Sequence, residues 1–131
     1  IELYTNAYSR LSGLKLSGDD KQLYNKLSVL ASVSGKYDAY KSFSDSGYVT
    51  MAADSLVCAA GRCAVNADNA KEYGCELQLE QLKNIISDTL SSQYGLSYDD
   101  AIALYNIDDR DDYTLALTQK LNELGIKEET K

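Results

Sequence analysis

Apolar residues recur at helical spacing along most of the chain. Positions three, four and seven apart share one face of a helix, so each such stripe predicts a helix with one buried side. The first predicted helix covers residues 1–15. The second could run to Ser34, and its stripe consists of Leu23, Leu27, Leu30 and Ala31.

Glycines and short polar clusters are expected to separate the helices, because the chain has no proline, the strongest helix breaker. Gly35 is expected to interrupt the second helix. Residues 36–43 then either continue that helix or form a short one of their own. Residues 44–47 read as a turn, and residues 66–74 as a connection with room for one helical turn.

Residues 48–64 form the predicted central helix. On a helical wheel one wide arc is apolar and rich in alanine, which lets neighbouring helices approach closely. That arc holds Ala52, Ala53, Leu56, Val57, Ala59, Ala60, Cys63 and Ala64. The opposite side holds Thr50, Met51, Asp54, Ser55, Cys58 and Arg62. We therefore expect the first set to face the core.

A long helix is predicted next, over residues 76–93. Gly95 follows it and is placed as its C-terminal cap, since glycine readily adopts the left-handed conformation found there. Ser97 and Asp100 then match a capping box, which opens a short helix through residues 101–106. The core stripe of the long helix consists of Leu79, Leu82, Ile86 and Leu90.

The last predicted helix starts in the acidic residues 108–112, which suit the positive end of a helix dipole. Gly125 ends it, and residues 126–131 form a frayed tail. Its core stripe consists of Tyr113, Leu117, Leu121 and Leu124.

No segment shows the alternation of a strand. We therefore predict an all-α fold, an irregular bundle of five to seven helices with an alanine-rich central helix near residues 48–64. The 131 residues form one domain, residues 1–131, which is long enough to bury a core without a metal or several disulfides.

The charge of the chain limits its partners. A formal net charge of −7 with no cluster of basic residues argues against nucleic acid and against anionic lipid. No apolar run approaches the roughly 18 residues of a membrane span, so this segment is not expected to insert into a membrane. The chain begins at Ile1, and we expect it to be a processed piece whose signal or anchor lay upstream.

The chain contains no histidine, and this excludes the catalytic triads and zinc sites that depend on it. No other pattern marks a catalytic residue or a cofactor site. The remaining groups for acid–base chemistry are carboxylates, lysines and tyrosines whose pKa values would have to be shifted by their surroundings.

All three cysteines lie within residues 58–75. Cys58 and Cys63 are five positions apart, about 140° around a helix, so they cannot both bind one metal ion while the helix persists. Cys63 faces inward near the end of the central helix, and Cys75 begins the next long one. Either they form a disulfide, which would add about 3 kcal/mol, or they are two small buried thiols.

Cys58 is left over on the polar side of the central helix. Asp54 and Arg62 lie four positions before and after it, so one neighbour would raise the pKa of its thiol and the other would lower it. Cys58 is therefore either a reactive thiol or a cysteine buried beneath a neighbouring helix.

Two further groups of residues are candidate sites. The acidic segment fails the EF-hand pattern, which needs a glycine at its sixth position and a glutamate at its twelfth, and serves either as a helix start or as a weak cation site. That site would use Asp108, Asp109, Asp111 and Asp112. Tyrosines occur eleven times and suit interfaces, although they also sit half-buried at helix edges. The interaction candidates are Tyr37, Tyr40, Tyr48, Tyr94, Tyr98 and Tyr105.

The segments DSLVCAAGR, YG at residues 73–74 and QYGLSYDDAIALYNIDDRDDYT carry a resemblance over residues 54–118. Here the chain resembles helical domains of cell-envelope proteins from low-GC Gram-positive bacteria. The resemblance implies an extracytoplasmic location, which favours the disulfide, but implies no activity.

Two main functions are consistent with these features, and a third is a cytosolic regulatory domain with three free thiols. The first is a non-enzymatic extracytoplasmic module for protein interaction or structural spacing, whose partner is a protein or another component of the cell envelope. The second is a small-ligand binder or enzyme that uses carboxylates and tyrosines in a pocket between helices, which requires a concave site.

Overall fold

A computed structural model describes residue 4 and residues 18–126 of the chain. This part contains six α-helices and no strand, so the predicted all-α bundle is confirmed. The predicted tail beyond Ile126 and, apart from residue 4, the predicted helix over residues 1–15 lie outside it. The helices are α2 (Gly18–Asp45), α3 (Val49–Val65), α4 (Ala67–Tyr73), α5 (Glu76–Tyr94), α6 (Tyr98–Tyr105) and α7 (Arg110–Glu123).

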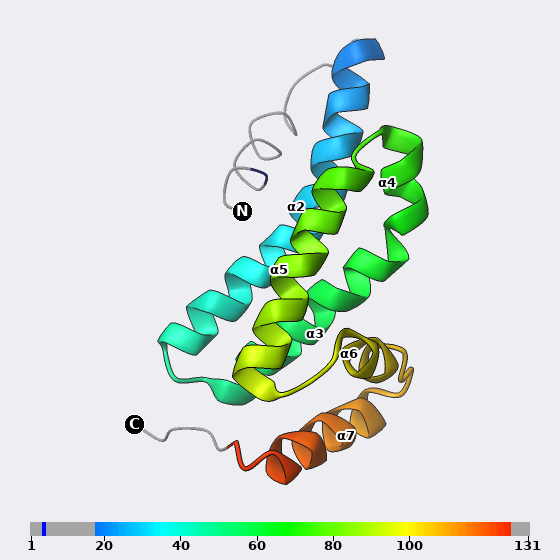
Figure 1. The fold of residues 1–131 in the computed structure, drawn as a ribbon. Helices are drawn as coiled ribbons and strands as arrows, with labels where there is room; N and C mark the ends of the chain where they lie inside the picture. Colours follow the sequence, from blue (N-terminus) through cyan, green and yellow to red (C-terminus); the bar gives the residue numbers. More distant parts are fainter. Residues whose placement is uncertain (1–3, 5–17, 127–131) are drawn as a thin grey trace.

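Three long helices, α2, α3 and α5, pack together along their lengths (Figure 1). The short helix α4 joins α3 to α5 at one end of this group, and α6 and α7 lie at the other end. No helix of the described residues is both long enough and apolar enough to cross a membrane.

Helix α3 is the centre of the bundle, as predicted. It contacts each of the other five described helices. Its alanines permit this, because a methyl side chain keeps neighbouring backbones close. Ala52, Ala53, Ala59 and Ala60 are at most 1% exposed. Two positions differ from the helical wheel, since Ser55 is buried and Ala64 is exposed.

Helix α2 runs without a break through Gly35, so the predicted interruption is wrong and the alternative, a continued helix, is observed. Glycine weakens a helix by only about 1 kcal/mol relative to alanine. Apolar residues bury a continuous face on both sides of it, including Val33 before and Tyr40 after. That packing outweighs the local preference. At the start of the helix Leu23, predicted as core, is 47% exposed.

Helix α6 crosses α3 at a glycine. Gly61 of α3 is buried, and a Cβ atom added there would overlap the ring of Tyr105 on α6. The tyrosine ring therefore occupies the space that any larger residue at position 61 would need. This contact fixes how closely the two helices approach.

The predicted helix ends are present. Gly95 and Gly125 have positive φ angles, +64° and +72°, which glycine adopts at little steric cost. Ser97 accepts a hydrogen bond from the Asp100 amide, and Asp100 accepts one in return, which completes the capping box. Residues 66–74 contain α4, whose seven residues make about two turns where a single turn was expected.

Candidate functional site

Cys63 and Cys75 lie in different surroundings, and both are free thiols in the structure. The Cys63 sulfur donates a hydrogen bond of 3.8 Å to the Leu79 carbonyl. Leu79 lies one helical turn after Cys75 in the chain. Lys26 of α2 is the charged side chain that acts on Cys75. The predicted disulfide is therefore absent. Helix α4 separates α3 from α5, and α5 then packs with Leu79, not Cys75, beside Cys63.

Burial raises the pKa of both thiols. At Cys63 the nearby Tyr98 hydroxyl and the Lys83 ammonium oppose that rise, and at Cys75 Lys26 opposes it. The two groups are thus protonated thiols at neutral pH and behave as small buried residues.

Cys58 is half-buried and its sulfur lies 3.9 Å from Asp54 Oδ1. The same carboxylate oxygen accepts a hydrogen bond from the Tyr113 hydroxyl of α7. Burial raises the pKa of the Cys58 thiol, and the negative charge of Asp54 raises it further. The positive charges of Lys36, Arg62 and Arg110 oppose this rise. A raised pKa argues against a reactive thiol.

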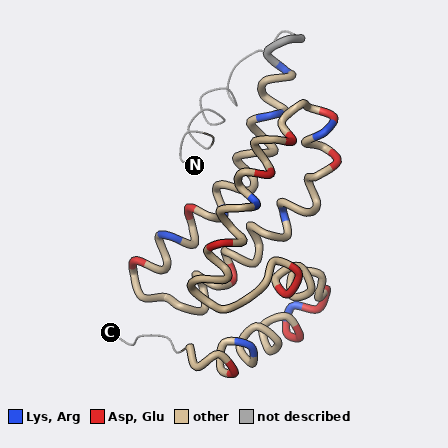
Figure 2. The backbone as a smooth tube through the Cα atoms, viewed as in Figure 1, with Lys and Arg blue, Asp and Glu red and all other residues tan. Residues whose placement is uncertain are grey.

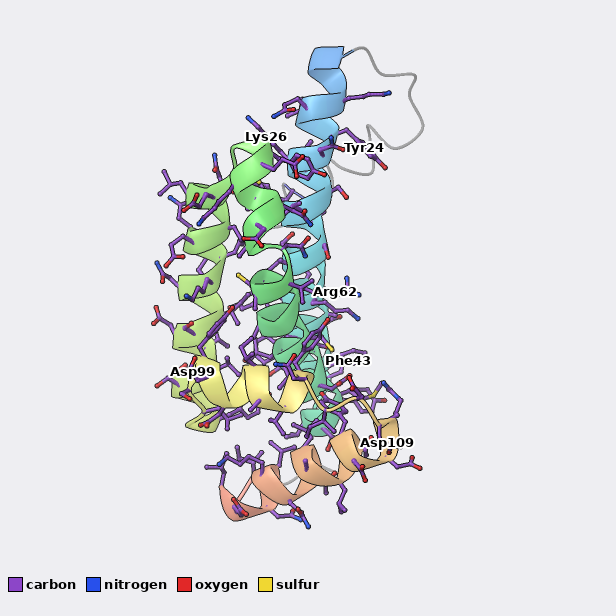
Figure 3. All side chains as sticks on the ribbon, turned by 90° about the vertical axis from the view of Figure 1, so that its right-hand side faces the viewer. Tyr24, Lys26, Phe43, Arg62, Asp99 and Asp109 are labelled. Carbon is purple, nitrogen blue, oxygen red and sulfur yellow. The ribbon has the colours of Figure 1, made fainter. Side chains whose placement is uncertain are left out.

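Arg62, the other predicted neighbour of Cys58, turns toward α2. Its Nη1 atom donates to the carbonyl and the hydroxyl of Ser32, both at 3.3 Å. Figure 3 shows Arg62 on the side of α3 that faces α2. Arg62 therefore ties α3 to α2 more directly than it acts on the thiol.

A small cavity of about 180 Å³ opens beside Cys58, between α3 and the connection from α6 to α7. It is too small for most ligands, whose sites occupy roughly 300–1,000 Å³. Among its polar groups, Asp54 accepts hydrogen bonds from Tyr113 and Cys58. Its lining consists of Asp54, Cys58, Tyr105, Ile107, Asp108, Arg110 and Tyr113.

The four predicted cation ligands are exposed and do not converge. No group of three or more acidic or cysteine side chains in the described residues is arranged to hold a metal ion. Asp109 instead caps α7, accepting a hydrogen bond of 3.0 Å from the Asp112 amide. Asp111 and Asp112 lie in its first turn, and Asp108 lines the small cavity. Figure 2 shows this acidic segment where α6 leads into α7.

Most of the predicted interaction tyrosines serve the bundle itself. Tyr40 and Tyr94 are buried with their ring centres 6.4 Å apart, and burial raises the pKa of Tyr94 to about 12. Tyr37 stacks near Tyr40 and shares a hydrogen bond of 3.1 Å with Thr89 of α5. These rings hold α2 to α5.

The other three tyrosines differ from one another. Tyr48, at the start of α3, is 51% exposed and remains available to a partner. Tyr105 packs over Gly61, as described above. Tyr98 is half-buried, and its hydroxyl donates to the Ala60 carbonyl over 3.2 Å. Tyr98 also lines a larger cavity, whereas Tyr105 lines the small one beside Cys58.

A groove of about 350 Å³ lies where α3, α4, α5 and α6 meet. Its volume reaches the lower part of the range that small-molecule sites occupy. Tyr98 forms one end, and the Lys83 ammonium lies 4.9 Å above the centre of its ring. The complete lining is Cys63, Ala64, Ala67, Lys71, Glu76, Leu79, Glu80, Lys83 and Tyr98.

The charged residues of this groove were not singled out in the sequence, although a signal existed. Glu76, Glu80 and Lys83 are spaced four and three apart, so they share a face of α5 beside its core stripe. Charged positions beside a core stripe usually face solvent alone. Only the position of α4, which brings Lys71 to the same groove, distinguishes them.

The described part of the chain is thus a helical bundle with a groove of ligand size bordered by charges of both signs. A comparison of the chain with protein-family models, with curated proteins and with solved structures finds no match. The resemblance of residues 54–118 to helical cell-envelope domains therefore stays a prediction.

Proposed function

We propose that this domain is a non-enzymatic, extracytoplasmic binding module and that the groove between α3, α4, α5 and α6 is its binding surface. The partner is a protein or another component of the cell envelope. One observation carries the proposal: a groove of about 350 Å³ combines a buried apolar floor with charged groups of both signs at its rim. Such a combination is typical of ligand sites.

The electrostatics favour binding over catalysis. A nucleophilic thiol or a phenolate base needs a pKa lowered toward neutral. Burial instead raises the pKa of Cys63 and Tyr98, the thiol and the phenol that line the groove. Both groups therefore stay protonated at neutral pH and offer contacts without acting as bases.

The location rests on the resemblance of residues 54–118 to envelope domains. Three free thiols are compatible with an oxidising compartment if an oxidant cannot reach them. Cys63 and Cys75 are at most 3% exposed, and Cys58 is half-buried beneath α7. Their burial is consistent with the proposed location.

A small molecule is a second candidate occupant of the same groove. Its volume and the two carboxylates in its lining favour this reading, which needs no extended contact surface. In that case a groove variant would lose ligand binding without losing any protein contact.

Photo-crosslinking in the cells that produce the protein tests the binding role. A photoreactive phenylalanine analogue placed at Ala67, in the groove, should form an adduct with a component of the cell envelope. The same analogue at Gln119, an exposed position on α7, is the matched control and should form none.

A second variant makes the result specific to the groove. Ala64→Trp places a large ring at an exposed position of the groove lining, so it should abolish the adduct without disturbing the core. Equal adducts at positions 67 and 119, or an adduct that survives Ala64→Trp, would contradict the proposal.

A further inference from the structure

The charges along the groove are ordered. Glu76 lies in the first turn of α5, Glu80 follows one turn later, and Lys83 lies beside Tyr98. Lys71 of α4 also lines the groove. The lining therefore holds two lysines and two glutamates, and its formal charge is zero. A ligand of zero net charge that carries both signs is therefore matched better than an anion or a cation.

An apolar wall lies between the charges. Cys63 and Leu79 are buried at 3% and 5% exposure, and the methyl groups of Ala64 and Ala67 border the opening. These surfaces cannot bond to charged groups. They suit aliphatic side chains, whose transfer from water to an apolar surface is favourable.

The length of the charged row is compatible with a short peptide. Seven residues of α-helix rise by about 10 Å from Glu76 to Lys83. An extended dipeptide spans about 7 Å between its ends, and a charge-assisted hydrogen bond adds about 2.8 Å at each. A dipeptide with free ends thus bridges this distance, given the reach of flexible glutamate and lysine side chains.

We propose that the groove binds a short aliphatic peptide with free ends. Its ammonium group lies at Glu76 and Glu80, its carboxylate lies at Lys83, and its side chains contact the wall of Cys63, Ala67 and Leu79. Tyr98 holds the Lys83 ammonium over its ring and so keeps it at the carboxylate end. This inference rests on the proposed function, since it names what the groove holds.

Isothermal titration calorimetry of the chain with leucyl-leucine tests the inference. Leucyl-leucine should bind with a Kd below about 1 mM. N-acetyl-leucyl-leucine lacks the ammonium and leucyl-leucine amide lacks the carboxylate, and each should bind at least about tenfold more weakly. Either derivative binding as tightly as the free peptide would overturn the inference, as would a Kd for leucyl-leucine above that limit.

Two groove substitutions should have the same effect from the protein side. Glu76→Gln and Lys83→Met keep the size of each side chain and remove its charge, so each should raise the Kd for leucyl-leucine about tenfold. Both positions are exposed or half-exposed, so the fold is retained, which circular dichroism verifies. An unchanged Kd in both variants would overturn the inference.

Matched controls come from a shallow hollow at the end of α2, which also has mixed charges but no apolar wall. It is lined by Asp38, Lys41, Ser42 and Asp45. Lys41→Met and Asp45→Asn should leave the Kd for leucyl-leucine unchanged. An equal loss in these variants would mean that only the overall charge of the protein matters, which contradicts the inference.

The two experiments together distinguish a failure of the peptide inference from a failure of the proposed function. If the Ala67 adduct forms in cells but leucyl-leucine does not bind, the groove is a binding surface with another occupant and only the peptide inference fails. If neither is observed, both the inference and the proposed function fail.

Discussion

At the scale of single residues, each of the three sulfur atoms has its own neighbours. Cys63 faces a carbonyl of α5, Cys75 lies near Lys26 of α2, and Cys58 lies beside Asp54 under α7. Three thiols that are close in sequence are thus separated in space by the helices that carry them. Their raised pKa values give each of them the chemistry of a small buried side chain.

This arrangement predicts the result of a thiol titration. Protein denatured without reductant should yield three free thiols per chain, because Cys63 contacts Leu79 and not Cys75. A thiol reagent whose product absorbs light measures the number directly. A single free thiol would instead indicate the Cys63–Cys75 disulfide that the sequence suggested, and would contradict the register of α5 described here.

At the scale of helices, two glycines have opposite roles. Gly35 lies within α2, and an added Cβ atom would meet no other atom within 4 Å. Gly61 lies within α3 against the Tyr105 ring. The backbone of both is helical, so the local propensity is the same. Only the neighbouring helix distinguishes them.

The two glycines therefore form a matched pair for one substitution. Gly35→Ala should raise the free energy of unfolding by about 0.5–1 kcal/mol, because alanine has less backbone entropy to lose. Gly61→Ala should lower it by about 1–3 kcal/mol, because the ring of Tyr105 must move. Urea denaturation followed by circular dichroism measures both values. Changes of the same sign would contradict the packing of α6 on α3.

Helix boundaries were largely predictable from local signals. The Ser97 capping box and the caps at Gly95 and Gly125 depend on residues adjacent in sequence, and the structure has all three. The break predicted at Gly35 failed because helix continuity there depends on burial against α3 and α5, which the local sequence does not encode.

At the scale of the whole molecule, buried tyrosines make the fold sensitive to alkali. Burial is the main cause that raises the pKa of Tyr94 to about 12 from its usual 10.0, and it also raises the pKa values of Tyr98 and Tyr113. At Tyr113 the hydrogen bond to Asp54 adds to the rise. The folded state thus keeps these phenols neutral at a pH where the unfolded chain ionises them.

The sign of the pH dependence follows. Between pH 10 and 12 the unfolded chain releases protons that the folded chain retains, so stability falls as pH rises. Below pH 10 this contribution is present in full. Each such tyrosine should contribute a slope of about 1.4 kcal/mol per pH unit in that window.

Urea denaturation at several pH values measures this slope, and tyrosinate absorbance follows the ionisation. Tyr94→Phe removes one buried phenol and should make the slope shallower. Tyr48→Phe removes an exposed phenol and should leave it unchanged. Stability that is constant from pH 9 to pH 12 would contradict the burial of these rings.

The helical class, the alanine-rich central helix and most helix ends could be predicted from the amino-acid sequence, because each depends on periodicity or on residues within one turn. The contacts between distant side chains could not be predicted in this way: Cys63 with Leu79, Asp54 with Tyr113, and Lys71 with Glu76 and Glu80 around one groove. Those contacts depend on how helices that are distant in sequence are aligned and crossed against one another. The position of α4 between α3 and α5 determines which residues of α5 face α3, and no local pattern in the α5 sequence predicts this alignment.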